Sequence, residues 1–314
     1  MDLRVNVGGL ELRNPIMPAS GTFGEGLDRV LDFELLGALV TKTVTRELRS
    51  GNPVPRVTET SSGMINSIGI PSDGIPYFIS TALPYYRRYR TPLVVSISAP
   101  TIEGFADLAA ELTRDGIAGI EANISCPNLE EDGRAFAMSA QATEAVVRRL
   151  RAATPLPLWV KLTPNVGEIA DVARAAEAAG ADALVVANTI LAMAIDVETF
   201  LPRLGYVMGG LSGPAIKPII VRQVFQCARA VRIPIVGCGG IMNAADAVEY
   251  LLAGATAVQV GTASSIHPTA MATIVEQLEA FMVRRNIETV ASLIGAVRVS
   301  ETPEGVNELV QSAS

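Results

Sequence analysis

One cysteine stands in a segment whose residue types could move a proton. Cys126 lies in the run Asn123-Ile-Ser-Cys126-Pro-Asn128, at the start of a long polar stretch and between two amide side chains. A thiol with a pKa of about 8.5 can act as a base when nearby positive charge or amide donors lower that pKa. Cys126 is therefore the candidate base, although the spacing alone leaves open an inert thiol. Cys227, in an apolar run, is predicted to be buried and inert, and Cys238 to pack beneath a glycine turn.

The lysines are a second chemical signal, because only three of the 25 basic residues are lysine. Lys42 and Lys161 each stand at the end of an apolar run, and Lys217 follows Gly213-Pro214. A compact ammonium suits a single anionic atom in a tight site better than the wide guanidinium of arginine. The pattern favours a role in binding or catalysis, and the alternative is that all three are solvated surface lysines.

Two glycine turns could hold a phosphate group. Gly239-Gly240 and Gly261-Thr262 each follow an apolar run, where backbone amides at the start of a helix can cradle an anion. Tight turns also need glycine, so either turn alone is a weak signal. The run Gly237-Cys-Gly-Gly240 lacks the third spaced glycine and the acidic residue of a dinucleotide fingerprint.

Other functions are disfavoured by composition. The chain has 314 residues, 49% of them hydrophobic, and a formal net charge of −7, which argues against a nucleic-acid footprint. Three scattered cysteines are too few for a disulfide framework or an iron–sulfur cluster, and the single histidine, His267, is expected at the surface or at a helix cap. No metal site is predicted. The sequence shows neither a membrane-spanning run nor a secretory signal, so a soluble, cytoplasmic protein is expected.

The elements that must position these residues alternate regularly. Short, nearly continuous apolar runs are typical of parallel strands buried on both faces, and we expect eight of them, at 15–18, 37–42, 93–97, 119–123, 158–162, 183–188, 233–237 and 257–261. Helical spacing of apolar residues is found between them, at 102–113, 169–179, 244–253 and 268–285. This order predicts a (β/α)₈ (TIM) barrel rather than an open sheet.

The remaining segments complete a single expected domain over residues 1–314. Residues 3–12 alternate about Gly8-Gly9, which predicts a β-hairpin that closes the floor of the barrel. Three strand-to-helix connections, 43–74, 125–139 and 188–213, are long enough to be either functional or disordered. A polar tail follows from about residue 303.

Three segments resemble the dihydroorotate dehydrogenase family. They are Asn123-Ile-Ser-Cys126-Pro-Asn128, then Asn66-Ser-Ile68-Gly69-Ile70, and the stretch from Asn188-Thr189 through Ala194-Ile-Asp196 to Gly209-Gly-Leu-Ser-Gly213-Pro-Ala-Ile-Lys217-Pro. The similarity covers nearly the whole chain and keeps the order of the motifs. The stretch from Ala192 to Pro214 resembles the soluble NAD-linked class rather than the fumarate-linked or quinone-linked classes.

The resemblance implies an FMN-binding barrel that oxidises dihydroorotate to orotate in pyrimidine biosynthesis. Cys126 would take the proton from C5 while hydride passes from C6 to the flavin. Substrate contacts would come from Lys42, Asn66, Ile68, Gly69, Ile70, Asn123, Asn128, Asn188 and Thr189. FMN contacts would come from Ser20, Gly21, Lys42, Asn123, Lys161, Ala187, Gly213, Gly239, Gly240, Gly261 and Thr262.

The resemblance also implies partners and leaves alternatives. In the NAD-linked class two catalytic chains form a dimer, and a second subunit carries FAD and a [2Fe–2S] cluster, which gives a heterotetramer. The loop 129–134 is more acidic than the usual version, and acidic side chains near a thiolate would slow the enzyme at neutral pH unless they point outward. The alternatives are the same reaction with fumarate or another acceptor, a barrel that binds flavin without turnover, and a flavin-free lyase or aldolase that uses Lys161.

Overall fold

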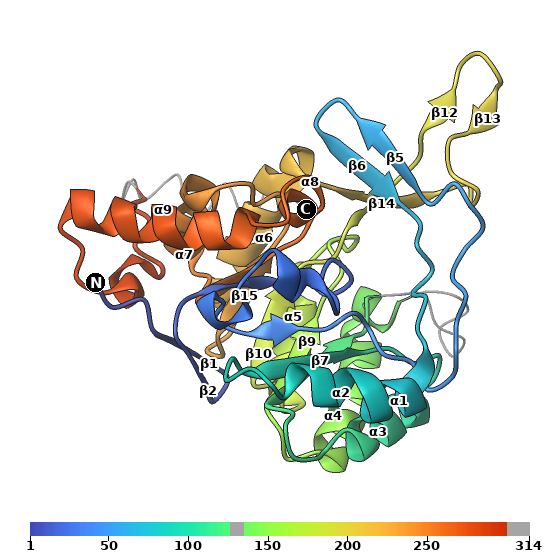
Figure 1. Cartoon of the computed structure of the whole chain (residues 1–314), viewed down its shortest axis with the longest axis horizontal. Coiled ribbons are helices and arrows are strands. Elements are labelled where there is room, and N and C mark those ends of the chain that lie inside the picture. The colour runs from blue at the N-terminus through green and yellow to red at the C-terminus, as the bar shows by residue number, and fades with distance from the viewer. Residues whose placement is uncertain (126–134, 300–314) are drawn as a thin grey trace.

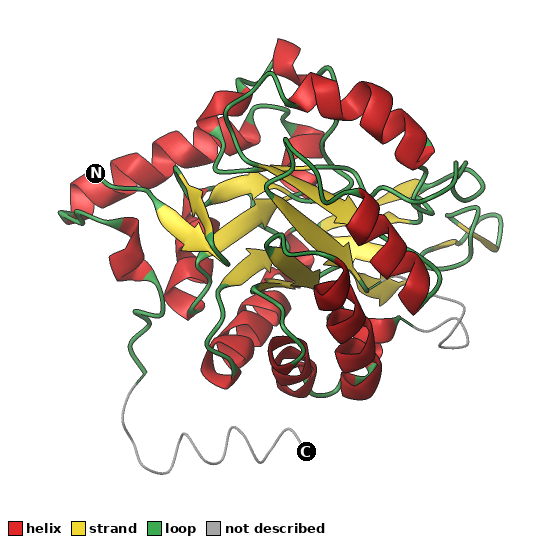
Figure 2. Cartoon of the chain, turned by 90° about the horizontal axis from the view of Figure 1, so that it is seen from below, coloured by secondary structure: helices red, strands yellow, loops and turns green. Residues whose placement is uncertain are grey.

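The computed structural model describes residues 1–125 and 135–299. Its main sheet has eight parallel strands in the order β3-β16-β15-β10-β9-β8-β7-β4, and it curls into a nearly closed barrel surrounded by helices (Figure 2). A hydrogen bond from the Gly37 amide to the Ile16 carbonyl (2.8 Å) links the two ends of the sheet. The strands are β3 (Ile16–Pro18), β4 (Leu39–Val40), β7 (Leu93–Ile97), β8 (Gly119–Asn123), β9 (Leu158–Lys161), β10 (Ala183–Val186), β15 (Ile235–Cys238) and β16 (Ala257–Val260).

The predicted barrel and its eight strands are therefore confirmed. The strand before Gly239 begins later than expected because Pro234 has no amide hydrogen for the sheet, and its carbonyl instead accepts from Leu184 (3.0 Å). The strand expected at 37–42 is reduced to β4. All residues of these strands are buried, as expected for a parallel sheet covered on both faces.

The helices follow the strands and pack outside them. They are α1 (Gly74–Tyr77), α2 (Leu83–Tyr86), α3 (Ile102–Glu111), α4 (Ala140–Ala153), α5 (Ile169–Ala178), α6 (Lys217–Ala230), α7 (Ala244–Ala253), α8 (Thr262–Ile266) and α9 (Ala270–Arg285). The expected start signals act as caps, since Thr101 accepts from the Gly104 amide and Asn243 forms a capping box with Asp246. In the described part of the chain, no helix has both the length and the apolar character that a membrane crossing requires.

The predicted hairpin lies at the floor of the barrel. Strands β1 (Val5–Val7) and β2 (Leu10–Leu12) pair across Gly8 and Gly9, both of which have positive φ. A Cβ at Gly8 would lie 2.8 Å from the carbonyl oxygen of Asp182, just before β10. The hairpin therefore rests on the amino ends of the strands, and the opposite end is left for the site.

Two of the long connections fold into a small sheet of their own. Strands β5 (Val57–Thr60), β6 (Gly63–Asn66), β11 (Ile190–Ala192) and β14 (Gly209–Ser212) pair antiparallel in the order β11-β14-β6-β5. A further hairpin, β12 (Ile195–Asp196) and β13 (Leu201–Pro202), extends from it. Figure 1 shows these strands projecting from the body of the molecule, and we refer to residues 57–66 and 190–212 as the arm.

Candidate active site

A buried lysine lies where β9 ends. The ammonium group of Lys161, whose residue is only 3% exposed, donates to Ser20 Oγ (3.1 Å) and to Gln259 Oε1 (3.2 Å). Ser20 follows β3 and Gln259 lies in β16, so side chains from three strands meet around one positive charge. The lysine predicted to stand at a strand end is thus buried among groups that accept hydrogen bonds.

Two predicted amides converge beside this lysine. Asn123 pairs in register with Lys161 across β8 and β9. The Ser125 hydroxyl donates to Asn123 Oδ1 (2.5 Å) and accepts from Asn188 Nδ2 (2.6 Å). The structure therefore joins Asn123 and Asn188, which are separated by 65 positions in the sequence, through a serine that was not predicted as a site residue.

Asn66 and Thr189 meet at the base of the arm. The Asn66 side chain donates to the Gly210 carbonyl (3.2 Å), and Thr189 lies so close to Gly210 that a Cβ there would collide with its hydroxyl. The side chain of Asn165, which was also not predicted, donates to the Thr189 carbonyl (3.1 Å). One predicted substrate residue, Asn66, thus lies in the arm, and another, Thr189, packs directly against it.

The predicted loop Ile68–Ile70 packs against residues of its own connection. The Ile68 carbonyl accepts from the Asn52 amide (3.0 Å), and a Cβ at Gly69 would lie 2.4 Å from Asn52 Oδ1. Ile70 has a φ of 49°, an unusual conformation for a β-branched residue. Such strain is held only where the surroundings demand it, which is common at ligand sites.

A glycine-lined turn lies where β14, β15 and β16 end. A Cβ at Gly240 would lie 2.7 Å from the Gly213 carbonyl oxygen, and one at Gly213 would lie 3.5 Å from the Thr262 side chain. The Thr262 hydroxyl donates to Ser212 Oγ (2.9 Å). Two of the predicted phosphate residues, Gly240 and Thr262, therefore lie together with Gly213, a predicted FMN residue, and Ser212 joins them.

One part of the phosphate prediction is wrong. Gly239-Gly240 does not stand at the start of a helix, because α7 begins only after Asn243, where the capping box with Asp246 already satisfies the first amides. Gly240 instead lies against Gly213 and the backbone of Lys217. Gly261 does stand where predicted, as the N-cap of the short helix α8.

The other predicted FMN residues surround these groups. Gly261 abuts the end of β3, since a Cβ there would lie 3.4 Å from that of Ala19, the residue before Ser20. Gly21 has a φ of 88° and is exposed. Buried Ala187 donates its amide to the Cys238 carbonyl (3.1 Å). The ends of β3, β10, β15 and β16 thus form one side of the barrel mouth.

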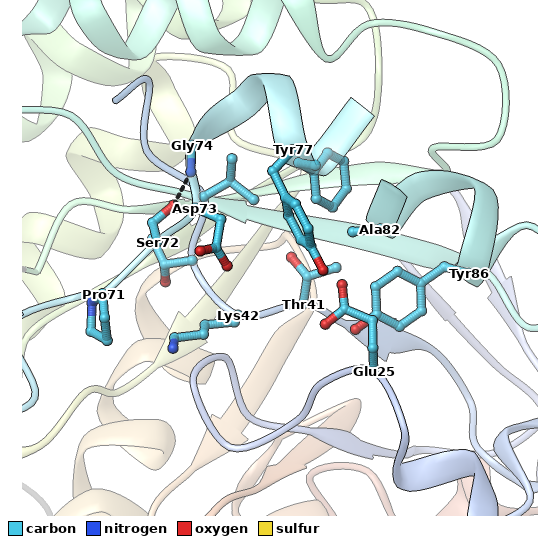
Figure 3. A pocket seen from close by; sticks show the side chains of 13 residues that line it. Glu25, Thr41, Lys42, Pro71, Ser72, Asp73, Gly74, Tyr77, Ala82 and Tyr86 are labelled. Carbon is cyan, nitrogen blue, oxygen red and sulfur yellow. Dashed lines mark hydrogen bonds between the residues drawn. The ribbon is translucent and has the colours of Figure 1, made fainter. Parts of the chain in front are cut away.

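Lys42 lies at the edge of a pocket of about 70 Å³. Figure 3 shows it near Pro71 and Ser72, with Glu25 and Tyr86 at the other side. Buried Thr41 accepts from the Ser96 amide and buried Thr43 bonds to Ser96 Oγ, which fixes the backbone on both sides of Lys42. The nearby carboxylate of Glu25 raises the pKa of Tyr77, so this pocket also holds negative charge.

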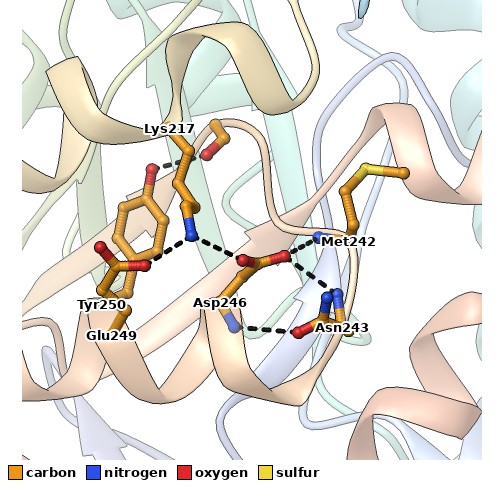
Figure 4. A network of polar contacts seen from close by, with 7 residues as sticks. Lys217, Met242, Asn243, Asp246, Glu249 and Tyr250 are labelled. Carbon is orange, nitrogen blue, oxygen red and sulfur yellow. Dashed lines mark hydrogen bonds and ion pairs between the residues drawn. The ribbon is translucent and has the colours of Figure 1, made fainter. Parts of the chain in front are cut away.

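The third lysine does not belong to the site. The ammonium group of Lys217 forms ion pairs with Asp246 (2.7 Å) and Glu249 (2.6 Å) on α7, as Figure 4 shows. These two hydrogen bonds raise the pKa of Lys217, the bond to Asp246 most strongly. Its role is to join α6 to α7, and the prediction that it suits a tight anion site is wrong.

We expect Lys217→Met to lower the free energy of unfolding by about 1–2 kcal/mol at pH 7, with little change in catalysis. Because the folded pKa is raised, this stability is fully present below the unfolded pKa of about 10.4 and is lost as the pH rises through the folded value. Urea unfolding of both proteins at pH 7 and above pH 11 measures it. A difference that persists undiminished at high pH would rule out the ion pairs as its source.

The structure confirms that Cys227 and Cys238 are buried and that His267 lies at the surface, as predicted. Cys227 is fully buried, and burial raises its pKa to about 12, so this thiol is inert. Cys238 is 8% exposed and its pKa is raised by burial. His267 is exposed at the C-cap of α8. Cys126 and Asn128 lie outside the described residues.

Sequence reasoning missed five polar residues of the site: Glu121, Gln259, Ser125, Asn165 and Ser212. The first two did leave a signal, since each is a single polar residue inside an apolar strand, in Ile120-Glu-Ala122 and Val258-Gln-Val260. In a parallel barrel such a residue must point either into the interior or into the helix layer, and in both places a polar group needs a partner. Ser125 and Ser212 lie outside such apolar runs, so no similar signal in the sequence marks them.

A barrel whose mouth gathers a buried ammonium, a pair of amides and a glycine-lined turn defines an enzyme of the (β/α)₈ class. A family model described as "Dihydroorotate dehydrogenase" matches residues 2–282. The chain therefore belongs to the dihydroorotate dehydrogenase family and is an oxidoreductase, as its motifs predicted.

Similar proteins extend this result over nearly the whole length. The "Dihydroorotate dehydrogenase B (NAD(+)), catalytic subunit" of Citrifermentans bemidjiense is 48% identical over 301 residues, which are 95% of this chain and 99% of the relative. Proteins of the same description from Geobacter sp. (strain M21) and Desulforamulus reducens are each 47% identical, with the same coverage. The predicted similarity to the NAD-linked class is confirmed, and an oxidoreductase is favoured over the barrel lyase.

Proposed function

We propose that this chain oxidises dihydroorotate to orotate in pyrimidine biosynthesis, with FMN held at the mouth of the barrel. The observation that carries the proposal is the pairing of Lys161 and Asn123 on adjacent strands, with Asn188 joined to Asn123 through Ser125. A cation beside several amides suits a ring with carbonyl and N–H groups and a negative charge. Such a clamp is selective because a wrong ligand leaves buried partners unpaired.

The residues present fit FMN. Gly213 and Gly240 come so close that any side chain would fill the turn, which leaves room for a phosphate beside Thr262. Ser20 and Lys161, at the end of β3 and β9, offer a hydroxyl and a positive charge to the ring. FMN supplies a hydride acceptor when it is bound. Gly21, Lys42, Asn123, Ala187, Gly239 and Gly261 would complete its contacts.

The chain's own residues would orient the substrate and move one proton. Asn66, Asn123, Asn188 and Thr189 would hold the ring, with Lys42, Asn128 and the loop Ile68–Ile70 closing around it. Cys126 would remove the C5 proton as the C6 hydride leaves, so both hydrogens are accounted for. The support for Cys126 is its position three residues beyond Asn123, within the family's motif.

We also propose that two copies associate through the arm and that a second subunit with FAD and a [2Fe–2S] cluster passes the electrons to NAD. The arm exposes many apolar side chains, among them Phe200 (85% exposed), Val197 (71%) and Leu201 (62%). Obligate homodimer interfaces are more apolar than ordinary surfaces, and most oligomers are symmetric assemblies of one chain. The support for a second subunit is the name "catalytic subunit" of the relatives.

We expect the native complex in the cytoplasm of its host cell, and its purification from there tests these proposals together. The complex is expected to be yellow, to lose its colour on anaerobic addition of dihydroorotate, and to recover it with NAD⁺. Its mass, flavin content and iron content are expected to match two copies of each subunit. A colourless chain that gains no FMN on incubation, or FMN that dihydroorotate does not reduce, would overturn the function. Recovery of colour only with fumarate would overturn the NAD-linked partner.

A further inference from the structure

A second buried charge lies inside the barrel, opposite in sign to Lys161. Glu121 in β8 is fully buried. Within residues 1–125 and 135–299, the buried charged side chains are those of Glu121 and Lys161. Gln259, 1% exposed, stands between them: its Nε2 donates to Glu121 Oε2 (2.5 Å) and its Oε1 accepts from Lys161 (3.2 Å). The three residues form a chain of hydrogen bonds from Glu121 to Ser20.

This chain crosses the interior of the barrel. Strand β16, which carries Gln259, is separated from β8 by three strands in the sheet order. A side-chain bond between them can only pass through the centre of the barrel. Lys161 is therefore tethered from the core, below the level of Ser20.

The two ends of the amide allow only one orientation of Gln259. An ionised carboxylate is an acceptor and an ammonium is a donor. The NH₂ group must therefore face Glu121 and the oxygen must face Lys161, as the structure has it. If the negative charge at residue 121 were removed, the amide could turn, and its NH₂ group would then repel the ammonium.

Stability alone is a poor reason to keep this carboxylate. Its second oxygen, Glu121 Oε1, is buried and has no hydrogen-bond partner among the described residues. A buried, incompletely satisfied charge costs free energy, and apolar replacements of buried ionic groups are often as stable or more so. A residue so placed is better explained by what it does to Lys161.

We propose that Glu121, acting through Gln259, is the positioning residue that holds the Lys161 ammonium toward the flavin. The inference rests on the proposed function, because it requires FMN at the mouth of the barrel. A cation fixed beside the ring makes reduction more favourable, since it offsets the charge that the ring gains. Without the tether the ammonium would be free to move away from the ring.

The proposal predicts a shift in the reduction potential of bound FMN that is opposite in sign to the shift expected from the charge of Glu121 alone. If Glu121 acted only through its charge, Glu121→Gln would remove a negative charge and make the flavin easier to reduce, with a more positive potential. If Glu121 positions Lys161, the same variant loses the fixed cation and becomes harder to reduce. The potential therefore distinguishes the two, and a purely structural role would leave it unchanged.

The experiment measures the reduction potential of bound FMN and its dissociation constant in Glu121→Gln, Gln259→Met and Lys161→Met. We expect more negative potentials in all three and an FMN dissociation constant raised roughly tenfold. Glu121→Gln in the Lys161→Met background is expected to give no further negative shift, because the tethered group is gone. The matched control is Gln223→Met, at a buried glutamine on α6 that donates to the Pro164 carbonyl, and it should leave the potential unchanged.

Each outcome decides between the claims. An unchanged or more positive potential in Glu121→Gln, with wild-type FMN affinity, would overturn the positioning role and leave the function intact. Negative shifts in a protein whose FMN dihydroorotate never reduces would support the positioning role and overturn the function. A wild-type chain that binds no FMN would overturn both. Thermal melting of the FMN-free variants identifies misfolding, and Gln259→Met then tests the tether with Glu121 in place.

Discussion

Replacing Cys126 with serine is expected to slow the reduction of bound FMN by dihydroorotate by roughly 10²–10⁴-fold at neutral pH, the usual contribution of a general base. A hydroxyl is a far weaker acid than a thiol, so almost none of the serine would be ionised to accept the C5 proton. Binding should change little, because the variant keeps Asn123, Ser125 and Asn188 and the hydrogen bonds that join them. Anaerobic stopped-flow bleaching of the flavin measures the rate directly.

The control for that variant is Cys227→Ala, which removes a thiol from the core of the protein instead of from the site. Cys227 is fully buried on α6, so its loss should lower the melting temperature and leave bleaching unchanged. A raised pH should speed the Cys126→Ser variant more than the wild type. Equal rates for wild type and Cys126→Ser would deny Cys126 its role as the base.

The barrel was predictable because its signal is local. A parallel strand buried on both faces must be apolar almost throughout, so Leu158–Lys161 and Ala183–Val186 can be recognised one at a time. The helix caps at Thr101 and Asn243 act over three residues and are equally visible. Eight such runs in alternation with helices leave few other folds.

The arm was not predictable in the same way, because its strands depend on distant partners. Strand β14 reads Gly-Gly-Leu-Ser and has little strand preference of its own, and although the β-branched residues of β5 (Val-Thr-Glu-Thr) favour a strand, they do not identify its partner. They become strands because β6 pairs with both, and because Gly210 lets Thr189 pack closely. Length alone could only indicate that these connections were functional or disordered.

The lysines show the same limit within the site. Counting singled out Lys42, Lys161 and Lys217 together, and spacing placed the first two at strand ends. In the structure Lys161 is buried among acceptors, Lys42 lines a pocket and Lys217 joins two helices. The partners that separate them, Gln259 and Asp246, lie 98 and 29 positions away. The type of a residue indicates what chemistry is possible, and only the closure of the barrel decides its neighbours.

Lys161→Ala is expected to slow flavin reduction by about 10²–10³-fold, the usual cost of removing a preorganised charge from a reacting site. Such a factor corresponds to about 2.7–4 kcal/mol of transition-state stabilisation. The cost in stability should be smaller, about 1–3 kcal/mol, because the variant loses the bonds to Ser20 and Gln259 but also loses a buried charge that was expensive to keep. Stopped-flow bleaching and urea unfolding of the same preparation give both numbers.

The comparison of those two numbers is what decides the role of Lys161. If the ammonium were mainly a structural partner for Glu121, its loss would leave that carboxylate uncompensated. The loss in free energy of unfolding would then exceed the loss of transition-state stabilisation for flavin reduction. A large drop in melting temperature with normal bleaching would therefore assign Lys161 to the fold. Lys161→Arg sharpens the test, because it keeps the charge but places a wider, planar group in a site that is only 3% exposed. Slow bleaching in the arginine variant as well would show that the position of the charge matters as much as its sign.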